Sequence, residues 1–161
     1  MSEYLGKKIP ENILSIISPD KEERLNSAVF LITVDTDGSP RSAMLSPYQI
    51  CSVSEWEFFF TVYKGSHTSM NLEENGKSLF IFQIEGGVTY IRCISEVMPQ
   101  ESIKNYFSDE ILFLASDLEV SRDFSEKARI TSVTSFDQSS VQKNYTETFR
   151  QIRNVAKSWK S

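Results

Sequence analysis

Short runs of β-branched and aromatic residues, separated by turn residues, fill the middle of the chain. They predict strands over 28–34, 41–50, 56–63, 78–85, 88–98 and 127–136. Pro47 interrupts the second run and predicts a bend or a sheet edge there, because proline cannot donate to a strand ladder. In the fifth run, small neutral residues alternate with larger ones, which is typical of a small barrel filled by compact side chains. The fold is therefore expected to be mainly β (α+β).

Apolar residues spaced three and four apart predict helices outside these runs. Residues 1–26 are expected to form a peripheral helical segment, with Ile13, Ile16 and Ile17 as its apolar face. A second helix is predicted over 99–118, and a terminal helix over 144–159 with a basic outer side. With 161 residues the chain is expected to be a single domain, 1–161, in which residues 27–136 form the barrel with its inserted helices.

The stretch from Trp56 to Phe82 is predicted to be strand, sharp turn, short helix and strand. Ser66 is placed to cap the helix, and Gly76 suits the left-handed residue that ends it. The first N–H groups of a helix are unpaired and its dipole is positive there, so an anion can dock. Polar side chains that suit a phosphate monoester gather at this helix start: Lys64, Ser66, His67, Thr68 and Ser69. An ordinary capped surface helix remains the alternative.

Composition narrows the function classes. The net charge of −5 disfavours a nucleic-acid binder, which usually carries a basic surface. Cys51 and Cys93 stand far apart in apolar runs and are expected to be reduced core residues of a cytoplasmic protein. No run of apolar residues has the length of a membrane span or a signal peptide, so no membrane partner is expected.

Few residues offer chemistry of their own. A single histidine excludes a multi-histidine metal centre within one chain, so no metal site is predicted. No phosphate-binding loop of the nucleotide-binding folds and no nucleophile elbow is present, and a Ser-His-Asp triad would have to use His67. The acidic pairs, Asp109-Glu110 among them, are interpreted as solvated helix faces. Any chemistry is therefore expected to come from a bound cofactor, and no catalytic residue is assigned.

The order of these elements resembles a known family. The segments VFLITVDTDGSPRSAMLSPYQI, EFFFTVYKGSHTSMNLEENGKSLFIF and GGVTYIRCI are similar to the FMN-binding split-barrel proteins related to pyridoxamine 5′-phosphate oxidase. The resemblance covers about residues 25–98. It implies a six-stranded antiparallel split β-barrel with flanking helices, forming a homodimer that binds FMN in two clefts between the subunits.

The resemblance also implies a set of cofactor-binding residues. The isoalloxazine ring would lie against Arg41, Ser42, Ala43, Met44, Leu45 and Ser46, and the phosphate among Thr61, Lys64, Ser66, His67 and Thr68. Asn71 belongs to the same set, more as a brace of the turn than as a ligand. Many relatives carry a lysine or arginine near positions 67 and 68, which this chain lacks. Lys64, Arg41 or a cation of the other subunit would have to compensate.

The resemblance implies an FMN-binding protein acting as a flavin-dependent oxidoreductase on an unidentified small molecule. Pyridoxamine-phosphate oxidase activity itself is not favoured, since the basic residues for a substrate phosphate are not found in the C-terminal part. Two alternatives stay open. One is a non-catalytic split barrel that binds flavin or haem, because SHTSMNL shares part of a His-Thr-x-x-Asn-Leu pattern of haem-utilisation proteins. The other is a dimeric interaction module without a cofactor.

Overall fold

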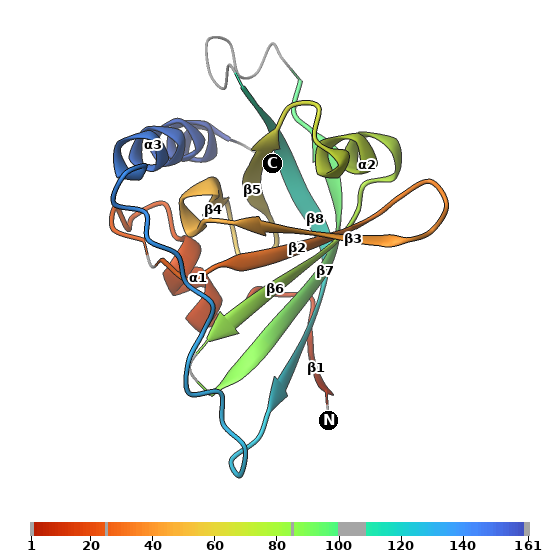
Figure 1. The fold of residues 1–161 in the computed structure, drawn as a ribbon, viewed down its shortest axis with the longest axis vertical. Helices are drawn as coiled ribbons and strands as arrows, with labels where there is room; N and C mark the ends of the chain where they lie inside the picture. Colours follow the sequence, from red (N-terminus) through yellow and green to blue (C-terminus); the bar gives the residue numbers. More distant parts are fainter. Residues whose placement is uncertain (1, 25, 85, 100–108, 160–161) are drawn as a thin grey trace.

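A computed structural model describes residues 2–24, 26–84, 86–99 and 109–159. The described strands are β1 (Ser2–Gly6), β2 (Val29–Val34), β3 (Pro40–Leu45), β4 (Ile50–Ser52), β5 (Phe58–Tyr63), β6 (Lys77–Ile84), β7 (Gly87–Val97) and β8 (Glu110–Phe124). The helices are α1 (Glu11–Ile17), α2 (His67–Asn75) and α3 (Gln142–Ser158), with a 3-10 turn η1 (Pro47–Gln49). The strands form one antiparallel sheet in the order β3-β2-β6-β7-β8-β5-β4, with β1 added beside β8 (Figure 1).

The sheet curls around a core of aromatic rings. Phe80 makes edge-to-face contacts with Phe58 and Phe60, both at 4.9 Å between ring centroids. Phe59 points the other way, as alternation along a strand requires, and its ring lies 5.6 Å from that of Trp159 beyond the end of α3. The strand β5 therefore joins the barrel core on one face to a second apolar cluster, beneath α3, on the other. The mainly β split-barrel fold class is confirmed.

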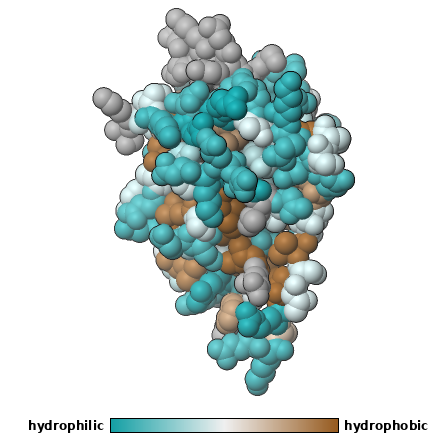
Figure 2. Space-filling view, turned by 90° about the vertical axis from the view of Figure 1, so that its left-hand side faces the viewer, coloured by the Kyte–Doolittle hydropathy of each residue, from teal (hydrophilic) through white to brown (hydrophobic). Residues whose placement is uncertain are grey.

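A long segment, residues 125–141, follows the edge of the sheet from the end of β8 to the start of α3 (Figure 1). Ala28 N–H donates to the Thr134 carbonyl at 2.7 Å, and Phe136 N–H donates to the Asn26 carbonyl at 3.2 Å. On the face of the molecule that Figure 2 shows, hydrophilic residues cover the upper part and the lowest tip, and apolar residues gather across the middle. This edge segment brings Phe136 and its neighbours to the open end of β3, where the candidate site lies.

The predicted helix ends, the predicted bend in the second strand and the predicted state of the cysteines are confirmed. Ser66 caps α2, because its hydroxyl accepts from Ser69 N–H at 3.1 Å. Gly76 ends the helix in the left-handed region with φ +67°. Pro47 lies in the 3-10 turn that separates β3 from β4, so the predicted run 41–50 does bend at this proline. Cys51 and Cys93 are buried and unbridged, as predicted.

The helix predicted over 99–118 is wrong from residue 110 onward, where β8 begins. This strand pairs with β7 along one edge and with β5 along the other. Phe113 and Ala115 face the barrel core, whereas Leu112 packs beneath α3. The spacing of the apolar residues fits both a helix and a strand. The strand forms because β5 and β7 each have an edge that is free to pair with it. The predicted positions Ile103 and Phe107 lie outside the described residues.

Two further predictions need correction. Residues 127–136 form no strand but one isolated bridge between Ser27 and Ser135, because none of these residues is buried. The segment 1–26 is not wholly helical: it begins with β1, and α1 has only 7 residues. The described sheet consequently has eight strands rather than six. No helix among the described residues is long and apolar enough to cross a membrane.

Candidate functional site

The start of α2 faces a pocket at the end of β3. The Ser66 hydroxyl is committed to the cap, since it also donates to the Tyr63 carbonyl at 2.8 Å. The backbone N–H groups of His67 and Thr68 have no hydrogen-bond acceptor among the described residues, as expected for the first turn of a helix. Thr68 is 7% exposed. This helix end therefore presents two free donors and the positive end of its dipole.

We call this hollow the α2 pocket; its volume is about 480 Å³. It is lined by residues of β3, the start of α2, β5, the edge segment and α3: Ala43, Met44, Leu45, Ser46, Gln49, Val62, Tyr63, Ser66, Thr68, Phe136, Asp137, Ser140, Val141 and Tyr145. Of the twelve residues predicted to hold the cofactor, the structure brings six together here: Ala43, Met44, Leu45, Ser46, Ser66 and Thr68. The other six do not line the pocket. The role of all twelve in binding FMN stays a prediction.

Arg41 and Asn71 are both engaged with Asp35. The Arg41 guanidinium donates to both carboxylate oxygens, with Nη2 at 2.9 Å from Oδ2 and Nε at 3.0 Å from Oδ1. Asn71 Nδ2 lies 2.7 Å from Oδ1 of the same carboxylate and 3.1 Å from Oγ1 of Thr33. The hydrogen bonds from Arg41 and then from Asn71 lower the pKa of Asp35 to about 2. Asn71 thus braces α2 against the turn after β2, and Arg41 is held away from the α2 pocket.

Of the remaining predicted residues, Ser42, Lys64 and His67 are exposed and lie outside the pocket lining. Thr61 is fully buried on β5, and its hydroxyl donates to Glu110 at 3.2 Å. Thr61 does not line a pocket itself, but it contacts a residue that lines a second hollow, which we call the Glu110 cavity.

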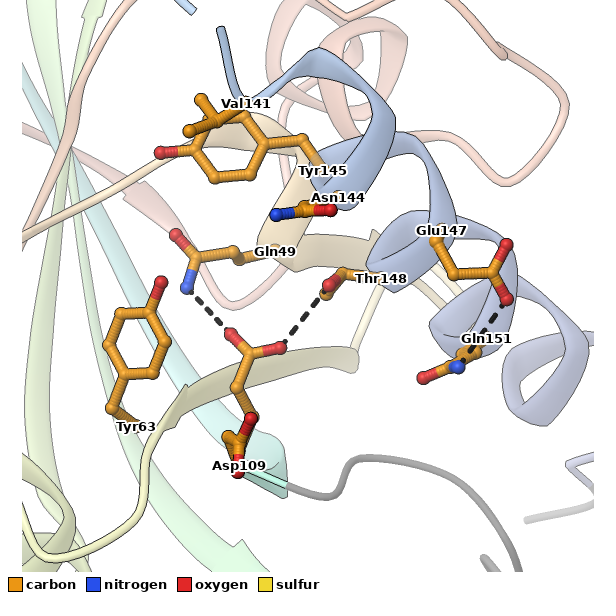
Figure 3. A pocket seen from close by; sticks show the side chains of 10 residues that line it. Gln49, Tyr63, Asp109, Val141, Asn144, Tyr145, Glu147, Thr148 and Gln151 are labelled. Carbon is orange, nitrogen blue, oxygen red and sulfur yellow. Dashed lines mark hydrogen bonds between the residues drawn. The ribbon is translucent and has the colours of Figure 1, made fainter.

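The Glu110 cavity, shown in Figure 3, has a volume of about 510 Å³. It is lined by Gln49, Tyr63, Asp109, Glu110, Val141, Asn144, Tyr145, Glu147, Thr148 and Gln151. Gln49, Tyr63, Val141 and Tyr145 also line the α2 pocket. The two hollows therefore adjoin each other at these four residues, and we call the two together the cleft.

Glu110 lies at the start of β8 with its carboxylate held by three neutral donors. Oε1 accepts from Gln49 Nε2 at 3.2 Å and Oε2 accepts from the Thr148 hydroxyl at 3.3 Å (Figure 3). Oε1 also accepts from the Thr61 hydroxyl at 3.2 Å. Burial raises the pKa of Glu110, and the three hydrogen bonds offset this only in part. The interpretation of Glu110 as part of a solvated helix face is wrong. Residue 110 begins a strand, and the side chain of Glu110 points under α3.

Among the residues that the structure describes, the charged ones that line the cleft are all acidic: Asp109, Glu110, Asp137 and Glu147. Only Glu147 has a cationic partner among the described residues, Arg150, at 2.8 Å. Sequence reasoning missed Gln49, Tyr63, Glu110 and Tyr145, which come together only through strand pairing and the docking of α3. The one available signal was Tyr145, which stands on the apolar stripe of the predicted C-terminal helix.

No family model matches the sequence. The uncharacterized protein YclD of Bacillus subtilis is 28% identical to this chain over 110 residues, which cover 68% of this chain and 70% of YclD. This similarity extends beyond a local motif, yet it names no activity.

Solved structures with the same architecture are more informative. A candidate pyridoxamine 5′-phosphate oxidase of Lactobacillus delbrueckii superposes with a TM-score of 0.56 at 16% identity, covering 73% of this chain and 98% of that one. The chain has the pyridoxamine 5′-phosphate oxidase-like split-barrel fold. A variant of HupZ from group A Streptococcus gives 0.52 at 14% identity, over 70% and 97% of the two chains. An F420 reductase gives 0.50 at 15% identity, over 67% and 94%.

Proposed function

We propose that the chain binds FMN in the α2 pocket and acts as a flavin-dependent oxidoreductase on a small molecule. The observation that carries this proposal is the meeting of residues 43–46, at the end of β3, with Ser66 and Thr68 around one pocket. These two groups are the parts of the chain expected to hold the ring and the phosphate. Two structures of the same fold are described as an F420 reductase and a candidate pyridoxamine 5′-phosphate oxidase, which supports a flavin-type cofactor.

The pocket suits the two ends of FMN. The free N–H groups of His67 and Thr68 and the dipole of α2 favour a phosphate at the helix start. Met44, Leu45 and Val62 supply apolar wall for a planar ring. The volume of about 480 Å³ falls within the range typical of cofactor pockets.

The charges around the pocket weaken this fit. No cation of the described part of the chain lines the α2 pocket, whereas Asp137 does. Arg41 is held by Asp35 and is poorly placed to compensate. We therefore expect the phosphate to be held mainly by backbone donors, with added positive charge from Lys64 or from a second copy of the chain.

A bound flavin would supply hydride transfer to or from the substrate. The residues of the chain would bind and orient the two molecules. Tyr63 and Tyr145 line both halves of the cleft, so they would help to exclude water.

We also propose that the protein forms a homodimer through the outer face of the sheet. Phe30 on β2 pairs with Met44 on β3 and with Ile81 on β6, which pairs in turn with Tyr90 on β7. These four side chains form an apolar row that faces away from the core, and Met44 is 62% exposed. A second copy covering the row would also lie beside the α2 pocket, because Met44 lines it. Light scattering on the purified protein is expected to give twice the mass of one chain.

An absorption spectrum of the purified full chain, followed by titration with FMN, tests the cofactor. Flavin bands that persist through desalting, or saturable quenching of FMN fluorescence, are the expected results. Colourless protein that leaves FMN fluorescence unchanged would overturn the proposal and favour an interaction module. A Soret band would instead indicate haem, which no contact here favours, since His67 does not line either half of the cleft.

A further inference from the structure

The half of the cleft away from α2 contains a carboxylate that forms no ion pair with any residue that the structure describes. Glu110 is largely covered by η1, β5 and α3, and its three hydrogen-bond donors are an amide and two hydroxyls. No lysine or arginine makes an ion pair with Glu110 among the described residues. A carboxylate that is removed from water in this way is stabilised by a cation or by protonation.

The donors fix the carboxylate in place without neutralising it. Gln49 is itself held, because its Oε1 accepts from Ser46 N–H at 2.9 Å while Nε2 donates to Glu110. Thr61 and Thr148 approach from the sheet and from α3. The remaining lone pairs of the carboxylate are therefore presented in a set direction on the wall of a cavity of about 510 Å³.

We propose that the Glu110 cavity binds a small organic cation with N–H donors, such as an ammonium or amidinium group, and that Glu110 selects it. The site lies beside the proposed ring site, so its ligand would be the substrate of the flavin. The inference therefore deepens the proposed function. The role of the cation as a substrate rests on that function, whereas binding of the cation does not require FMN.

The remaining surroundings support a cation over an anion or a neutral molecule. Asp109 adds a second negative charge at the mouth of the cavity, and the Glu147 charge is offset by Arg150. Tyr63 and Tyr145 offer ring faces that attract a cation. An anion would meet repulsion, and a neutral molecule would leave the Glu110 charge unpaired.

Three probes of the same shape and different charge test the inference on the full chain: benzamidinium, benzamide and benzoate. Binding is followed by NMR shifts of the protein, with and without saturating FMN. We expect benzamidinium to bind at least about tenfold more tightly than benzamide, and benzoate not to bind. Equal affinities for the three probes, measured on the unmodified protein, would overturn the inference without any variant.

Variants then locate the site. Glu110→Gln keeps the shape of the side chain and should remove the preference for benzamidinium, a loss of about tenfold in affinity. Glu147→Gln is the matched control, because Glu147 lines the same cavity but is paired with Arg150; its affinity should stay within about twofold. An unchanged preference in Glu110→Gln would refute the role of Glu110. Binding of benzamidinium without FMN binding would refute the proposed function alone, and FMN binding without cation selectivity would refute this inference alone.

Discussion

The Arg24 guanidinium carbon lies 3.9 Å from the centre of the Phe149 ring, which fastens the N-terminal segment to α3. The same guanidinium donates to the carbonyls of Ile16 and Ile17 at the end of α1 and of Ile50 on β4. Burial lowers the pKa of Arg24 to about 10, so the group stays charged at neutral pH. Arg24 thus satisfies three carbonyls that no other side chain reaches in the described part of the chain.

Replacing Arg24 by methionine, which is apolar and unbranched, is expected to lower the free energy of unfolding by about 3 kcal/mol. The loss follows from leaving buried carbonyls without donors and from losing the contact with Phe149. Urea denaturation followed by circular dichroism measures it. Arg150→Met is the control, since Arg150 makes an exposed pair with Glu147, and its effect should stay within about 0.5 kcal/mol. Equal losses in the two variants would contradict the structural role of Arg24.

The sequence predicted those features of the fold that depend only on a residue and its neighbours along the chain. The cap by Ser66, the left-handed end at Gly76 and the bend at Pro47 each follow from the properties of one residue, and all three are present. The strand β8 could not be assigned in the same way, because its apolar residues fit a helix as well as a strand. Only the free edges of β5 and β7, which are distant in sequence, select the strand.

The candidate site was predictable in the half that is built from one continuous stretch. Ser66 and Thr68 follow β5 directly, so their position at a helix start was visible in the sequence. The Glu110 cavity joins η1, β8 and α3. Gln49 of η1 and Thr148 of α3 donate to Glu110 of β8 from 61 and 38 positions away in the sequence. No spacing rule connects residues so far apart, and the wrong secondary structure at residue 110 concealed the carboxylate.

Gly76→Ala is expected to destabilise the protein by about 2 kcal/mol. The residue has φ +67°, and a Cβ atom there would lie 2.7 Å from the carbonyl oxygen of Ser95 in β7. Gly65→Ala is the control: it has φ +71° but open space around it, so only the backbone strain of about 1 kcal/mol applies. Thermal or urea unfolding of both variants tests the difference. Equal losses would mean that α2 shifts easily against β7.

Thr68→Lys is expected to tighten FMN binding about tenfold. Thr68 is almost fully buried and lines the α2 pocket, so a lysine there would extend its ammonium toward the proposed phosphate site. No cation among the described residues lines that site. Met70→Lys adds the same charge to α2 at a position that is 49% exposed and outside the pocket. Fluorescence titration should show less than a threefold change for that control. Equal gains in both variants would indicate general attraction rather than a phosphate site at Thr68.

The raised pKa of Glu110 predicts how stability depends on pH. The folded state favours the protonated carboxyl more than the unfolded chain does, because burial disfavours the charge. The stabilising contribution is therefore complete below the unfolded value of about 4.5, and it is lost as pH rises through the higher pKa of the folded state. Asp109, Tyr63, Tyr145 and Glu147 are the other titratable groups among the described residues that line this cavity, and Arg150 pairs with Glu147.

Glu110→Gln removes this titration while keeping the size of the side chain. The difference in unfolding free energy, variant minus unsubstituted protein, is expected to rise as the pH passes 4.5 and approaches the higher pKa of the folded state, and to level off above it. The reason is that only the unsubstituted protein bears the cost of burying the charge. The measurement is urea denaturation at each pH. Asp109→Asn, which removes a charge at the mouth of the same cavity, should show a smaller slope, since Asp109 is exposed. A difference in unfolding free energy that does not change with pH for Glu110→Gln would mean that the three hydrogen bonds fully offset the cost of burying the charge. Glu110 would then not need a cation to stabilise its charge.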